Sequence, residues 1–244
     1  GKMAAAYVLG IQKNGIAACP KHFAVNSQEL RRMASDSIVD ERTLREIYLT
    51  GFEIAVKEGH PRSIMSSYNL VNGTYANENK HLLMEILRGE WGFDGAVITD
   101  WGGSNDHALG VKNGSTLEMP APGGDSVREL LAAVESGKIS ESDIDARLSE
   151  LLPLVFDTKA ALDAAPREFD AAAHHALARR AAEESLVLLK NEGSLLPLAA
   201  GSKVAVIGDF AKNPRYQGAG SSMVNSTQVD VLLDKLIDSE LNVI

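Results

Sequence analysis

The sequence has little of what several classes of protein require. It contains one cysteine in 244 residues, which rules out an internal disulfide and a cysteine-based metal cluster. We expect that residue, Cys19, to be a buried and unreactive thiol, because it lies in a predicted apolar strand. No apolar stretch approaches the roughly 18–20 residues of a membrane-spanning helix, so we expect no membrane partner. No signal-peptide pattern opens the sequence.

Positive charge is also scarce. The 24 Lys and Arg residues face 33 Asp and Glu residues, which gives a formal net charge of −9 at pH 7. Because the sequence has no long basic run and no alternation of basic and aromatic residues, we expect no nucleic-acid partner. A composition of 45% hydrophobic and 23% charged residues is typical of a globular protein.

Cofactor and metal motifs are absent as well. The glycine-rich segment 217–225 follows a predicted strand, but its spacing matches neither the dinucleotide fingerprint nor a P-loop. The adjacent His174 and His175 point to different sides of a predicted helix, which makes a poor metal site. We therefore expect no cofactor and no metal. A nucleotide-binding α/β protein built on strand 203–208 is a weaker alternative.

Predicted strands and helices alternate over the first part of the chain. Asp40 is a plausible cap for a strongly amphipathic helix that Gly59 ends, and Ser140 opens a capping box. Strand–helix alternation at this spacing is typical of parallel βα units and predicts an α/β fold. The predicted helices cover 2–12, 41–58, 82–89, 127–136 and 141–152, and the predicted strands cover 16–19, 64–68, 97–101 and, more weakly, 116–119.

The pattern changes after residue 157. We interpret 158–170 as a linker, because it contains alanine and proline and few large apolar residues. A new unit, 171–244, follows, with a helix over 171–190, a buried strand over 203–208, a helix over 231–237 and the first residues of a strand at 242–244. We interpret both ends of the sequence as internal to a longer protein.

Polar side chains follow successive predicted strands. Asp100 and Trp101 end one strand, Tyr68 ends another, and Lys21 and His22 follow a third. In a parallel barrel these strand ends share one rim, so the side chains would form a hydrogen-bonding ring with an aromatic platform, which suits a sugar. Each residue alone has an ordinary alternative. Asp100 could cap the next helix, the Lys-His pair could be a solvated loop, and Tyr68 could be a rim aromatic.

Four segments together carry a resemblance to a known family. KHFAVNSQELRR, SIMSSYNLVNGTYANEN, WGFDGAVITDW and ESLVLLKNEGSLLPL resemble glycoside hydrolase family 3, specifically its β-glucosidase-like members. The resemblance implies the C-terminal part of a (β/α)8-type barrel over 1–157, followed after the linker by the start of an α/β sandwich domain over 171–244. The N-acetylglucosaminidase branch carries an Asp-His dyad after its Lys-His-Phe motif. Residues 24–29 contain no such histidine, which favours a glucosidase.

The resemblance also implies roles for individual residues. Asp100 corresponds to the catalytic nucleophile. Lys21, His22 and Arg32 would bind the hydroxyls of the sugar, Tyr68 would lie close to the nucleophile, and Met65 and Trp101 would line the pocket. Taken alone, Arg32 reads as part of a surface charge cluster, and Met65 as an ordinary apolar strand residue.

A retaining glycosidase needs a second carboxyl group as acid/base, roughly 5–5.5 Å from the nucleophile. In the family this group is a glutamate of the sandwich domain, which would lie beyond Ile244. We do not expect Glu29, Asp106 or Glu118 to take its place. The prediction is a retaining glycoside hydrolase that releases terminal β-D-glucosyl or related residues from a β-glucoside or oligosaccharide and needs the remainder of the enzyme to complete its barrel and active site. The alternative is a non-catalytic carbohydrate-binding protein on a degenerate hydrolase fold.

Overall fold

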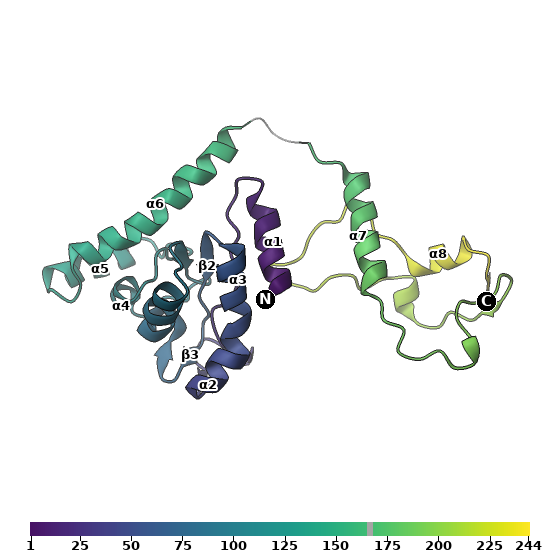
Figure 1. Cartoon of the computed structure of the whole chain (residues 1–244), viewed down its shortest axis with the longest axis horizontal. Coiled ribbons are helices and arrows are strands. Elements are labelled where there is room, and N and C mark those ends of the chain that lie inside the picture. The colour runs from purple at the N-terminus through teal and green to yellow at the C-terminus, as the bar shows by residue number, and fades with distance from the viewer. Residues whose placement is uncertain (165–167) are drawn as a thin grey trace. The chain divides into compact units, whose positions relative to one another are not determined.

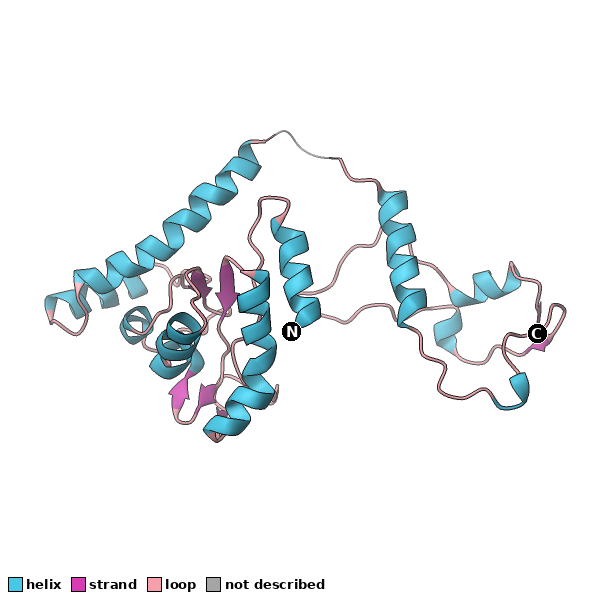
Figure 2. Ribbon diagram, viewed as in Figure 1, coloured by secondary structure: helices cyan, strands magenta, loops and turns pink. Residues whose placement is uncertain are grey.

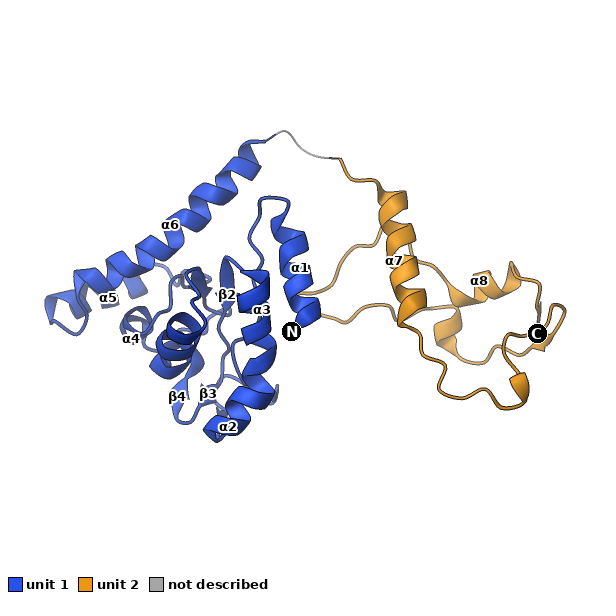
Figure 3. Ribbon diagram, viewed as in Figure 1, with its two compact units in different colours: residues 1–167 blue, residues 168–244 orange. Residues whose placement is uncertain are grey.

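The computed structural model describes residues 1–164 and 168–244. The chain divides into two compact units, residues 1–167 and 168–244 (Figure 3). The predicted linker 158–170 begins inside a helix, because α6 (Glu141–Asp163) continues six residues past the expected end of the first domain. Part of that linker, residues 165–167, lies outside the described residues.

Parallel segments in chain order form the centre of the first unit. β2 (Ser63–Met65) pairs with β5 (Ala96–Ile98) in parallel, with Ser63 opposite Ala96 and Met65 opposite Ile98. Extended segment 20–23 pairs with the other edge of β2, and segment 116–119 pairs with the other edge of β5. The order along the sheet is thus 20–23, β2, β5 and 116–119 (strands in Figure 2).

The sequence overestimated the lengths of these strands. The predicted strand 16–19 is not a strand: Ile16 is 52% exposed, and the backbone pairs with β2 only from Pro20 onward. Cys19 is half-buried rather than buried, although burial still raises the pKa of its thiol. The predicted strand 116–119 is reduced to one bridge, between Leu117 and Ile98. The length of a strand depends on the segment it pairs with, which local sequence does not report.

Helices cover the parallel segments. α1 packs against α3, and the contact is close because Gly59 has no side chain: a Cβ there would lie 3.1 Å from Ala5 Cα and 3.1 Å from Val8 Cβ. The expected capping box at Ser140 is present at the start of α6. The helices of this unit are α1 (Lys2–Gln12), α2 (Glu41–Thr43), π-helical η1 (Leu44–Leu49), α3 (Thr50–Gly59), π-helical η3 (His81–Glu90), α4 (His107–Lys112), α5 (Asp125–Glu135) and α6 (Figure 1).

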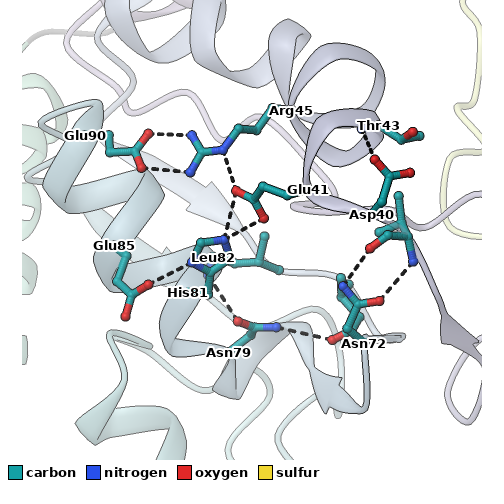
Figure 4. Close-up of polar contacts among 12 residues, drawn as sticks. Asp40, Glu41, Thr43, Arg45, Asn72, Asn79, His81, Leu82, Glu85 and Glu90 are labelled. Carbon is teal, nitrogen blue, oxygen red and sulfur yellow. Dashed lines mark hydrogen bonds and ion pairs between the residues drawn. The ribbon is translucent and has the colours of Figure 1, made fainter.

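Asp40 starts the long helix made of α2, η1 and α3, as expected, by accepting a hydrogen bond from the backbone N–H of Thr43 at 3.0 Å. A polar network ties this helix to η3 (Figure 4). Arg45 donates to both carboxylate oxygens of Glu90, at 2.6 and 2.8 Å, and His81 Nε2 lies 3.0 Å from Glu41 Oε2.

The apolar core lies between these helices and the parallel segments. Phe23, which follows the Lys-His pair, is fully buried and makes edge-to-face contacts with Phe52, at 5.2 Å between ring centroids, and with Trp91, at 5.8 Å. Leu82 and Ile86 of η3 are also fully buried in this cluster. Packing of Phe23 therefore fixes the backbone directly after His22.

A small sheet follows β2. β3 (Leu70–Val71) pairs with β1 (Asp36–Ser37) in parallel and with β4 (Thr74–Tyr75) in an antiparallel hairpin. The turn of the hairpin is Asn72-Gly73, with φ of 51° and 86°, a conformation that asparagine and glycine tolerate best. The 3-10 helix η2 (Ala76–Glu78) comes next and leads into η3.

The second unit has less regular structure than expected. α7 (Ala171–Ser185) ends five residues before the predicted 190, and the predicted buried strand 203–208 is only the two-residue β6 (Lys203–Val204), which is not buried. β6 pairs in parallel with β7 (Asn242–Val243), and α8 (Leu232–Ile237) lies between them in the chain. Two short 3-10 helices, η4 (Glu192–Ser194) and η5 (Asp209–Ala211), complete the unit.

Candidate active site

The candidate site lies where the parallel segments of the first unit end. Asp100 comes two residues after β5, Tyr68 three residues after β2, and His22 lies in segment 20–23. Because the segments are parallel and adjacent, their carboxyl ends meet at one edge, and the side chains that follow them lie together.

Each carboxylate oxygen of Asp100 has a close polar neighbour. Its side chain is 13% exposed, and Oδ1 accepts a hydrogen bond from the backbone N–H of Trp101 at 2.7 Å. Oδ2 lies 3.3 Å from Nε2 of His22. The carboxylate is thus mostly buried and lies next to His22.

His22 is the immediate neighbour of this carboxylate. Burial lowers the pKa of its imidazole below the ordinary value of 6.5, and the positive charges of Lys21 and Arg32 act in the same direction, against the attraction of Asp100. The imidazole is therefore uncharged at neutral pH.

Tyr68 and Arg32 form a stacked pair beside Asp100. The guanidinium carbon of Arg32 lies 4.7 Å from the centre of the Tyr68 ring, and the Tyr68 hydroxyl donates to the carbonyl oxygen of Trp101 at 2.8 Å. Burial raises the pKa of Tyr68, and the nearby carboxylate of Asp100 raises it further. Arg32 also forms an ion pair with Glu29 at 2.8 Å.

The structure brings some of the predicted site residues together and places Lys21 and Met65 differently. His22, Arg32, Tyr68, Asp100 and Trp101 lie in one cluster, and the Trp101 side chain stays available because the residue is 54% exposed. Lys21 is exposed and influences the site through the charge that it places beside His22. Met65 is half-buried, and its backbone pairs with segment 20–23, as Phe23 N–H donates to its carbonyl oxygen at 2.8 Å.

Two family models match this chain. Residues 1–154 match the model of the glycosyl hydrolase family 3 N-terminal domain, and residues 186–240 match that of the family 3 C-terminal domain. This chain belongs to glycosyl hydrolase family 3.

Curated members of family 3 share much of this sequence. The chain is 46% identical over 237 residues to thermostable beta-glucosidase B of Acetivibrio thermocellus, covering 96% of this chain and 31% of that protein. It is 41% identical over 247 residues to an exo-alpha-(1->6)-L-arabinopyranosidase of Bifidobacterium longum, covering 98% and 32%. The chain thus spans about a third of the length of the curated relatives it matches.

Solved family 3 structures share the fold. The GH3 beta-glucosidase of Bifidobacterium adolescentis superimposes with a TM-score of 0.91 at 40% identity, over 98% of this chain and 35% of that one. Beta-glucosidase 3B of Thermotoga neapolitana in complex with alpha-D-glucose gives a TM-score of 0.91 at 37% identity, over 99% and 35%. These matches support the predicted α/β class.

Three other carboxylates of the first unit, those of Glu29, Asp106 and Glu118, have partners of their own. Glu29 pairs with Arg32, and Asp106 caps α4 and lies 2.8 Å from Lys138 Nζ. Glu118 Oε2 lies 3.6 Å from Nδ1 of His107.

Two absences concern the described ranges, 1–164 and 168–244. No group of three or more histidine, cysteine, aspartate and glutamate side chains is arranged to hold a metal ion there. Within the same residues, no helix combines the length and apolar character needed to cross a membrane.

Sequence reasoning missed a buried polar cluster under the site. Asn77 and Glu78 of η2 are 0% and 5% exposed, and both contact the segments that surround Asp100. They occur inside the quoted segment SIMSSYNLVNGTYANEN, yet a polar Asn-Glu pair after a turn reads as surface. Only their burial distinguishes them.

Proposed function

We propose that this chain forms the nucleophile-bearing part of a retaining glycoside hydrolase that releases a terminal β-D-glucosyl residue, or a related sugar. The observation that carries the proposal is the Asp100 carboxylate, 13% exposed, 3.3 Å from His22 and directly followed by Trp101. The names of the family 3 relatives, beta-glucosidases and an arabinopyranosidase, support a terminal pyranoside as the substrate.

The chemistry follows the retaining mechanism. One oxygen of Asp100 attacks the anomeric carbon while the bond to the aglycone oxygen breaks, and that oxygen takes a proton from a carboxylic acid. Water then attacks the glycosyl ester and gives its proton back to the same carboxyl group, which releases the sugar and restores Asp100. We propose that this second carboxyl group comes from outside these 244 residues, since Glu29, Asp106 and Glu118 each already have a partner, namely Arg32, Lys138 and His107.

The other site residues bind and orient the sugar in this proposal. His22 and Arg32, together with Lys21, hydrogen-bond its hydroxyls, and the uncharged imidazole serves as donor or acceptor at neutral pH. The exposed ring of Trp101 stacks on the apolar face of the sugar, with Met65 further along the pocket wall.

The fold proposal is that residues 1–157 are the C-terminal part of a (β/α)8-type barrel and 171–244 the start of an α/β sandwich domain. Parallel segments that lie side by side in chain order are what such a barrel requires. The first family match, 1–154, ends close to residue 157, and the second, 186–240, lies within 171–244. The remaining polypeptide would pair with the outer segments and close the site.

Substitution of Asp100 in the complete enzyme tests the function. Asp100→Asn removes the nucleophile with little change of shape, so we expect turnover of an aryl β-glucoside to fall by at least about 10³-fold while glucose affinity is retained. Asp94→Asn is the matched control, because Asp94 is an exposed carboxylate that precedes the first residue of β5, whereas Asp100 follows its last residue. Near-normal turnover by Asp100→Asn, or equal losses in both variants, would contradict the role of Asp100 as nucleophile. An unsubstituted protein that binds glucose but turns over no aryl β-glucoside would favour the non-catalytic carbohydrate-binding alternative.

A further inference from the structure

Glu78 is a buried carboxylate that the proposed mechanism does not use. It ends η2 and is 5% exposed. Its Oε1 accepts hydrogen bonds from two successive backbone N–H groups, those of Asn105 at 2.8 Å and Asp106 at 2.7 Å. These two amides end the loop 101–106, which begins at Trp101 and leads from Asp100 into α4. Glu78 therefore contacts the far end of the loop that follows the nucleophile.

The near end of this loop is tied to the strand ends. Gly102 N–H donates to the carbonyl oxygen of Met119 at 3.0 Å, and Gly103 N–H donates to that of Asp100 at 2.8 Å. Gly102 has a φ of 75°, a conformation that favours glycine. Because the loop is short, a shift of its far end would displace Trp101. The backbone N–H of Trp101 donates to Asp100, and its carbonyl oxygen accepts from Tyr68.

Glu78 itself is rigidly held. Its neighbour Asn77 is fully buried, and Asn77 Oδ1 accepts hydrogen bonds from Ser66 and Ser115, each at 2.9 Å. Ser66 follows β2, and Ser115 precedes segment 116–119, so η2 is anchored to the segments on either side of β5. The carbonyl oxygen of Glu78 also accepts from Asn113 at 2.7 Å.

Keeping a carboxylate in this position is costly. Burial raises the pKa of Glu78, and the negative charges of Asp106 and Glu129 raise it further, while the two loop amides oppose them. Buried polar groups persist when their hydrogen bonds are made, and a lost acceptor would leave the two amides unpaired. The contact with the loop is thus what this side chain contributes.

We propose that Glu78 is a positioning residue: by binding the amides of Asn105 and Asp106 it holds loop 101–106, and through that loop it sets the orientation of Trp101 and Asp100 for attack on the sugar. This inference rests on the proposed glycosidase function. It assigns Glu78 no contact with the substrate.

The test measures formation of the covalent intermediate in the complete enzyme. Inactivation by 2,4-dinitrophenyl 2-deoxy-2-fluoro-β-glucoside gives a saturating rate constant for attack by the nucleophile and a separate binding constant. Because displacement of a loop can cost up to about 10²-fold, we expect Glu78→Ala to lower the rate constant about tenfold or more. Glu78→Gln keeps an acceptor oxygen at the same position, and we expect its rate constant to stay within about threefold of the parent.

Glu129→Ala is the matched control. Glu129 also accepts from a backbone N–H at the start of α4, that of Ala108 at 3.1 Å, but it does not touch the loop. We expect its rate constant to stay within about threefold even where its melting temperature falls as much as that of Glu78→Ala. Glu78→Asp serves if the alanine variant fails to fold. It keeps the charge but withdraws the oxygens, so we expect it to be slow while Glu78→Gln remains fast.

An unchanged rate constant in Glu78→Ala would overturn the inference. So would a Glu129→Ala variant as slow as Glu78→Ala, because the effect would then be general destabilisation. A slow Glu78→Gln with a fast Glu78→Asp would show that charge, not the contact, matters. If the glycosidase proposal itself fails, the unsubstituted enzyme forms no adduct on Asp100, which is a distinct result.

Discussion

We expect the substitution Glu150→Ala to destabilise the region around β5 by about 3–5 kcal/mol, because it leaves two buried guanidinium groups without their counter-charge. Glu150 accepts from Arg88 at 2.7 Å and from Arg147 at 2.6 Å, and all three side chains are about nine-tenths buried. Burial lowers the pKa of Arg88 to about 10, so it stays charged at neutral pH.

The cluster supports the strand that leads to Asp100. Arg88 donates to the carbonyl oxygens of Gly95 at 3.1 Å and Gly114 at 3.0 Å, on either side of β5. Thr116 links Glu150, at 2.6 Å, to the backbone N–H of Val97, at 3.0 Å. Loss of Glu150 should therefore lower the free energy of local opening at the β5 amides more than at other segments.

Hydrogen exchange followed by mass spectrometry on peptides that span β5 reports this local opening free energy. Because Arg88 and Glu150 are coupled, we expect the double variant Glu150→Ala/Arg88→Met to lose at least about 1 kcal/mol less than the sum of the two single variants. The control is Glu183→Ala, which breaks an exposed pair with Arg179 at 2.7 Å and should cost under about 0.5 kcal/mol. Additive losses, or a loss for Glu150→Ala no larger than for Glu183→Ala, would refute the reasoning.

Three further predictions concern single side chains. Asp40→Ala removes a helix cap and should lower the urea midpoint of unfolding, whereas Asp40→Asn should leave the midpoint nearly unchanged, since asparagine also caps. Hydrogen bonding, chiefly to Glu85, raises the pKa of His81 above its ordinary 6.5. The protonated imidazole therefore stabilises the folded state fully below pH 6.5, and this contribution is lost as the pH rises through the folded-state pKa. Unfolding titrations at about pH 5.5 and pH 8.5 should show this difference, at most about 1 kcal/mol for an exposed group, and it should vanish in His81→Gln. Tyr68→Phe removes the hydrogen bond to the Trp101 carbonyl, and a loss of about 0.5–1.5 kcal/mol should lower kcat/KM about two- to tenfold; a kcat/KM equal to that of the parent would contradict the assigned contact.

Features encoded by neighbouring residues could be predicted from the sequence. The caps at Asp40 and Ser140 were expected and are present, because each is a contact across three residues of one chain segment. The helix over 2–12 has the bounds that its apolar spacing predicts. Strand lengths were harder to predict. Segment 203–208 reads as a buried strand, but its length depends on the segment it pairs with, and the structure has a strand over 203–204 alone in this segment.

The candidate site divides in the same way. Asp100 and Tyr68 could be predicted to lie together, because each follows a strand and parallel strands end at one edge. His22 does lie beside Asp100, but within the segment that pairs with β2 and not after a strand. Their catalytic roles remain predictions. Glu78 could not be found, because its importance comes from burial against a loop 27 residues away in the chain. No local pattern separates such a glutamate from a solvated one.

The central claim is that Asp100 becomes covalently bonded to the anomeric carbon of a sugar. The most direct measurement is to trap the complete enzyme with a 2-deoxy-2-fluoro-β-glucoside, digest it and locate the added mass by tandem mass spectrometry. We expect the label on the peptide that contains Val97, Asp100 and Trp101, at the aspartate, and no label in Asp100→Asn. A stable label on any other carboxylate, or an enzyme that turns over normally without Asp100, would contradict the account.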